Sequence, residues 1–156
     1  MTGKTAAASI VIAAFLTGIS VWYLQLYYYY DTIDPEQVEI RLTPSDGGAP
    51  RPLEISEFEG IDATSSPLRM RGCFRVRESL ETLRREYTVM PDPTPLVGPG
   101  WFECYDANTV GDDLESGAAV AFLGEKAIAD GVDRVIAIYP DGRGYVWHQL
   151  NDKYQD

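Results

Sequence analysis

The sequence predicts an α+β protein in which a single N-terminal transmembrane helix precedes a small, mainly antiparallel β domain with one or two short helices. Two observations predict this fold class. Residues 6–26 contain no charged side chain, although 24% of the whole chain is charged. Beyond them, short segments that alternate apolar and polar residues are separated by turns rich in glycine and proline, which is typical of antiparallel strands.

The uncharged segment 6–26 has the length of a membrane span. A helix rises about 1.5 Å per residue, so the segment reaches about 31 Å, close to the thickness of the hydrocarbon core. Lys4 precedes it and Asp31 is the first charged residue after it, so we expect the N-terminus in the cytoplasm. Aromatic residues crowd its C-terminal end, where rings favour the headgroup layer: Trp22, Tyr23 and Tyr27–Tyr30.

The predicted organisation has three parts: a cytoplasmic N-terminus and anchor (1–30), a linker (31–37) and an acidic extracytoplasmic α+β domain (38–156). A cleaved signal peptide is the competing interpretation, because Gly18-Ile19-Ser20 places small residues where a signal peptidase cuts. We favour the anchor because the apolar run continues beyond Ser20 and is longer than a usual signal core.

Small residues lie along one face of the predicted span: Ala7, Ala14 and Gly18. Two small residues spaced four apart, as Ala14 and Gly18 are, let a second helix approach closely. We therefore predict helix packing against an integral membrane protein complex at this face. Contact with the lipid bilayer alone is the alternative, since such pairs are common in spans.

Nearly all charge lies beyond the anchor. That part carries 24 acidic and 12 of the 13 basic residues, so its formal charge is −12. An acidic surface excludes nucleic acid as a partner, because phosphate binding needs a basic one. It could attract a basic soluble partner, although solubility is the simpler interpretation.

The two cysteines, Cys73 and Cys104, both follow the anchor. If that part faces an oxidising compartment, a pair of cysteines normally forms a disulfide. The sequence contains no Cys-x-x-Cys motif and no histidine cluster, either of which would indicate a redox or metal role for the cysteines. We predict a structural disulfide.

Residues 68–77 give the clearest strand signal. Alternation places Cys73 and four arginines on one face: Arg69, Arg71, Arg75 and Arg77. These arginines could dock an acidic or lipid-phosphate partner. We favour a solvated face whose arginines pair with acidic residues on neighbouring strands, because charge on one face is ordinary for a one-sided sheet.

The other elements follow from local patterns. Residues 53–66 show no clear period. A single helix over 113–129 is an alternative to the short helix (111–117) and the buried strand (118–123) that we predict there. In chain order we predict a strand (38–42), a loop (44–52), a helix capped by Ser79 (79–87), an irregular proline-rich loop (90–100), a strand-like segment (101–105), a short helix capped by Asp112 or Asp113 (111–117), a buried strand (118–123), a hairpin (134–139 with 145–150) and a polar tail (151–156).

No arrangement of residues indicates catalysis, so we expect a non-enzymatic protein with no metal and no cofactor. His148 is the only histidine, and alternation places it opposite Trp147 on the wetter face of its strand. Asp112, Asp113 and Glu115 could bind a divalent cation weakly, but capping a helix is the simpler interpretation of these residues.

Four segments near the end of the chain carry a resemblance: Val120–Glu125, Gly131–Val135, Tyr139–Tyr145 and Trp147–Asn151. They are similar to an uncharacterised family of small alphaproteobacterial proteins with one N-terminal span and one acidic domain. The resemblance implies a single-pass protein of the bacterial inner membrane with a periplasmic C-terminal domain. It implies no role for any residue.

Two functional hypotheses follow. The first is a non-enzymatic accessory or assembly subunit of a bacterial inner-membrane complex, with a respiratory complex as the leading candidate. The second is a membrane-tethered periplasmic binding module or sensor for a small ligand or envelope component, with a pocket near the proline-rich loop or the arginines.

Overall fold

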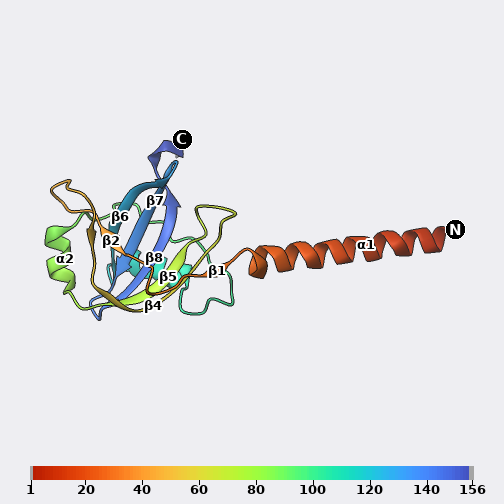
Figure 1. The fold of residues 1–156 in the computed structure, drawn as a ribbon, viewed down its shortest axis with the longest axis horizontal. Helices are drawn as coiled ribbons and strands as arrows, with labels where there is room; N and C mark the ends of the chain where they lie inside the picture. The colour runs from red at the N-terminus through yellow and green to blue at the C-terminus, as the bar shows by residue number, and fades with distance from the viewer. Residues whose placement is uncertain (1, 155–156) are drawn as a thin grey trace.

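The computed structural model describes residues 2–154. Residues 31–154 form a domain that we call the head, and a six-stranded antiparallel sheet forms its centre (Figure 1). The fold class predicted from the sequence is confirmed. In spatial order the strands are β1 (Asp31–Thr32), β4 (Ile55–Asp62), β5 (Arg71–Val76), β8 (Arg143–Leu150), β7 (Val132–Ile138) and β6 (Val120–Ala129). A separate pair is formed by β2 (Arg41–Leu42) and β3 (Arg51–Pro52).

The N-terminal helix α1 (Gly3–Tyr23) continues through one π-helical turn, η1 (Leu24–Tyr28), and extends away from the head (Figure 1). No residue of either element is buried. Together they span 26 residues, or about 39 Å at 1.5 Å per residue, which is long and apolar enough to cross a membrane. The hydroxyls of Thr17 and Ser20 donate to carbonyls four residues earlier, so the helix satisfies them internally.

The sheet is covered on both faces, which the sequence analysis did not anticipate. On one face, Phe122, Ile136 and Val146 pack with residues of β2 and of helix α2 (Leu80–Glu86). On the other, Val135 and Trp147 pack with Val110 of helix α3 (Ala107–Ser116) and with the segment before it. Because successive side chains of a strand alternate in direction, strands such as β7 are buried on both sides.

Several predicted elements are confirmed. The β7–β8 hairpin pairs Ile138 with Gly144 across the expected turn. Helix α2 begins after Ser79, whose hydroxyl accepts a hydrogen bond from the Thr82 amide. Residues 91–99 have no helix or strand, as their prolines predict.

Other predictions were wrong. Residues 101–105 form turns and not a strand. Helix α3 starts earlier than predicted and is capped by Asp106, whose carboxylate accepts from the amides of Asn108 and Thr109. Of the strand predicted over 38–42, only β2 pairs, and the predicted linker 31–37 contains β1, which pairs with β4 at the sheet edge.

Candidate functional site

Contacts between the end of the helix and two loops of the head form the candidate site. We call it the junction, defined as Gln25, Leu26, Tyr27 and Tyr30 of the helical side with Arg69 and Trp101 of the head. The Arg69 guanidinium donates to the Gln25 carbonyl oxygen (3.2 Å) and to its side-chain Oε1 (2.7 Å). It also lies 5.4 Å from the centre of the Tyr30 ring, within reach of a cation–π interaction.

Trp101 makes the second set of contacts in the junction. Its indole Nε1 donates to the Leu26 carbonyl oxygen. Its ring stacks on Tyr27 with centroids 6.2 Å apart and meets Tyr30 edge-on at 5.9 Å. Carbonyls at the end of a helix have no intrahelical partner, and the head therefore supplies donors to two of them.

Arg71 holds together the two loops that carry the head side of the junction. Its guanidinium donates to the carbonyls of Leu68 (2.7 Å) and Met70 (2.6 Å) around Arg69, and to those of Leu96 (2.7 Å) and Val97 (3.2 Å) before Trp101. The side chain is 3% exposed, and burial lowers the pKa of its guanidinium. Arg71 thus acts as an internal clamp.

The predicted disulfide between Cys73 and Cys104 is confirmed, with Cα atoms 6.3 Å apart. It links β5 to the segment that follows the proline-rich loop. Since Trp101 lies three residues before Cys104, the bond and the Arg71 clamp both restrain the loop that presents Trp101.

The four predicted docking arginines do not form one surface. Arg69 belongs to the junction and Arg71 is buried, because the second face of the sheet is covered and not solvated. Arg75 is exposed, lies 3.9 Å from a carboxylate oxygen of Glu57 and donates to the Asp141 carbonyl. Arg77 is exposed at the end of β5.

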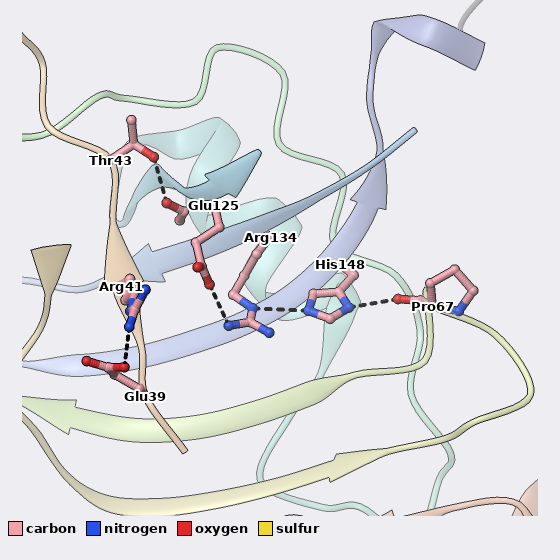
Figure 2. Close-up of polar contacts among 8 residues, drawn as sticks. Glu39, Arg41, Thr43, Pro67, Glu125, Arg134 and His148 are labelled. Atoms are coloured by element: carbon pink, nitrogen blue, oxygen red, sulfur yellow. Dashed lines mark hydrogen bonds and ion pairs between the residues drawn. The ribbon is translucent and has the colours of Figure 1, made fainter. Parts of the chain in front are cut away.

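A row of polar side chains crosses three strands on the opposite face from Arg71 (Figure 2). Arg134 donates from Nη1 to Glu125 (2.9 Å) and from Nε to Nε2 of His148 (3.1 Å). The other ring nitrogen of His148, Nδ1, lies 2.7 Å from the Pro67 carbonyl oxygen. Nδ1 therefore carries the proton and Nε2 accepts, which is the neutral tautomer.

His148 is buried, with 4% exposed, so its predicted place on a wetter face was wrong. The loop at Pro67 covers it. Burial lowers the pKa of His148 to about 4, and the charges of Arg134 and Arg71 add to that effect. This histidine fastens the β4–β5 loop, which carries Arg69, to the centre of the sheet.

The His148 ring hydrogen bonds to an arginine and a backbone carbonyl, and neither partner is the nucleophile or carboxylate of a catalytic triad. Between residues 2 and 154, no group of three His, Cys, Asp or Glu side chains is placed to hold a metal ion. Asp113, one of the three residues of the weak cation site considered from the sequence, accepts a hydrogen bond from the Tyr139 hydroxyl (2.7 Å).

The predicted helix-packing residues lie on α1, away from the head. Ala7, Ala14 and Gly18 are exposed, and a Cβ added at Gly18 would meet nothing within 4 Å. Their packing against another helix stays a prediction.

Sequence reasoning missed the junction as a unit. Its two hydrogen-bonding pairs join residues 44 and 75 positions apart, a distance that no local pattern reports. One signal in the sequence pointed to it: Trp101 follows an irregular segment rich in glycine and proline. A tryptophan in such a segment is not explained by packing in the core of the domain.

Comparison with known proteins adds the family. No curated protein and no solved structure matches the chain. One family model matches residues 40–156, which is three quarters of the chain and covers nearly the whole head, including Arg69 and Trp101. The chain therefore belongs to DUF6446, a family of unknown function.

Proposed function

We propose that this protein is a non-enzymatic accessory or assembly subunit of a bacterial inner-membrane protein complex, with a respiratory complex as the first candidate. In this proposal the helix α1–η1 is a permanent anchor, the N-terminus is cytoplasmic and the acidic head is periplasmic. Lys4 before the span and the acidic residues after it support this orientation.

The junction is the observation that carries the proposal. Arg69 and Trp101 fix the head to the end of the helix, so the head has a set orientation relative to the span. A partner that contacts both span and head then binds a preorganised surface, which lowers the entropy lost on association. A module that searches for a ligand would be served better by a mobile tether than by this fixed contact.

The test is purification of the full-length protein from its own membranes in mild detergent, with mass spectrometry of what accompanies it. We expect stoichiometric membrane subunits. Gly18→Leu should abolish their association because it fills the small-residue face, while Ile12→Leu, on the opposite face, should not. A protein that purifies alone as a monomer would contradict the proposal. Association that survives Gly18→Leu would contradict the helix contact only.

A membrane-tethered binding module is the second candidate, supported by a hollow beside the proline-rich loop. The hollow measures about 500 Å³ and lies against α3, with Pro91, Pro93, Pro95, Leu114 and Glu115 among its lining residues. This candidate predicts that a small envelope component raises the melting temperature of the full-length protein in detergent. No shift across a broad panel of such compounds would argue against it.

A further inference from the structure

The junction determines how deep in the membrane two side chains of the head, Arg69 and Trp101, would lie. Residues 6–26 form the uncharged part of the span, so Leu26 lies at its outer limit. Arg69 and Trp101 hydrogen bond to Gln25 and Leu26 and must lie at nearly the same depth. In an embedded protein that depth is the headgroup layer, where tryptophan and arginine are both favourable.

The two loops that carry these side chains also lie at the membrane end of the head. They are the β4–β5 loop and the segment between α2 and α3, and Figure 1 shows them on either side of the point where the helix meets the head. Val97 is 74% exposed and Trp101 is 37% exposed, so the second loop presents apolar surface to its surroundings.

One stretch of each loop lacks acidic residues, although the head as a whole is strongly acidic and Asp92 and Glu103 flank the second stretch. Residues 63–68 and 93–102 contain no Asp or Glu and no basic residue. A surface without carboxylates avoids repulsion by anionic lipid phosphates, which the rest of the head would experience.

Arg69 directly follows the first stretch and is the cation of the β4–β5 loop. Among residues 2–154 it forms no ion pair, since its hydrogen bonds go to neutral oxygens of Gln25. A guanidinium binds phosphate oxygens strongly, and unused N–H groups of Arg69 remain for a phosphate at the same depth.

We propose that residues 63–69 and 93–102 form a second membrane contact, which binds the phospholipid headgroup layer with Arg69 on a lipid phosphate and with Trp101 and Val97 among the headgroups. This inference rests on the proposed anchoring of α1–η1. The lipid contact would hold the head against the bilayer and would add to the orientation set by the junction.

Photocrosslinking in lipid nanodiscs tests the contact. The full-length protein carries a benzophenone amino acid in place of Val97, of Ala49 in the β2–β3 loop at the far end of the head, or of Phe15 in the span. The nanodiscs contain phosphatidylethanolamine with a minority of phosphatidylglycerol. Intact-mass spectrometry then counts lipid adducts.

We expect lipid adducts at positions 97 and 15 and none at position 49. Adducts at 15 without any at 97 would overturn the lipid contact and leave the proposed anchoring intact. No adduct at 15 would overturn both, because the span would not be in lipid. Equal yields at 97 and 49 would show random collision of the head with the bilayer and would also overturn the contact.

The role of Arg69 is tested in the position-97 protein. Arg69→Gln should remove most of the adduct at 97, whereas Arg69→Lys, which keeps the charge, should retain it. Arg84→Gln, on an exposed position of α2, is the matched control and should have no effect. An unchanged yield in Arg69→Gln would overturn the phosphate contact.

Discussion

Acidification should destabilise the head through His148, and the substitution His148→Gln should remove that sensitivity. In the native head the neutral ring donates from Nδ1 to Pro67 and accepts at Nε2 from Arg134. A proton on Nε2 would break the second hydrogen bond and bury a positive charge next to a guanidinium. A glutamine amide offers one donor and one acceptor and does not titrate.

The size of the effect follows from the pKa of His148. The value is lowered from 6.5 to about 4 in the folded head, so on acidification the unfolded chain takes up the proton first. The stabilisation is therefore fully present above pH 6.5 and is lost as the pH falls towards 4. The gap between the two pKa values corresponds to about 3 kcal/mol in the free energy of unfolding. No correction for solvent screening applies, because the side chain is 4% exposed.

Denaturant unfolding of the full-length protein in detergent, followed by tryptophan fluorescence, measures this quantity, because unfolding exposes the fully buried Trp147. Wild type and His148→Gln are compared at neutral pH and at steps down to the acidic limit. Carboxylates contribute to both proteins, so the difference between the two curves isolates His148. Parallel pH dependence of stability in the two proteins would refute the reasoning, as would a variant that loses more stability on acidification than the wild type.

Three further predictions concern stability and use the same assay. The double variant Cys73→Ala/Cys104→Ala should unfold with about 4 kcal/mol less free energy, by the loop-entropy model for this disulfide, and alkylation of native wild type should find no free thiol. Arg71→Met should lower the free energy of unfolding by about 3 kcal/mol, because it leaves buried and part-buried carbonyls without their hydrogen-bond donor. The exposed variant Arg77→Met should change it by less than about 0.5 kcal/mol, and equal effects of the two variants would contradict the role of Arg71 as a clamp. Gly111→Ala, in open space within α3, should stabilise by about 0.5–1 kcal/mol, and a loss would show a constraint on this glycine.

Local patterns predicted the parts of the fold whose period is regular. The β7–β8 hairpin was predicted because its alternation runs unbroken up to a Pro-Asp-Gly turn. Strand β4 was missed because its pairing with β5 shifts register between Ser56 and Glu59, where Glu57 has a positive φ of 53°. The irregularity removes the period that would have revealed the strand.

Gly124 shows how one residue can mislead. The buried strand predicted from the sequence ends at residue 123, directly before this glycine, but β6 continues through Gly124 to Ala129. A Cβ at this position would lie 2.8 Å from the Ile136 side chain and 3.0 Å from the Arg134 carbonyl, so the glycine serves close packing and not a turn. Such a contact depends on a neighbouring strand, which a local pattern cannot contain.

The candidate site was predicted only in pieces. The disulfide followed from cysteine count and compartment, and Arg69 was singled out with three other arginines. Its partner Gln25 and the role of Trp101 depend on how the whole head sits on the helix. The covering of the second sheet face by α3 and its preceding segment, which buries Arg71, likewise arises from tertiary packing.

The place of β8 in the sheet bears on how the protein is made. β8 is the last strand in chain order, yet it lies between β5 and β7, where it joins two groups of strands that do not pair with each other. During synthesis the β1–β4–β5 group and the β6–β7 hairpin must wait for it before the sheet can close. If the head is periplasmic, as proposed, it crosses the bilayer as an unfolded chain, and this order would keep the sheet from closing inside the cell before translocation.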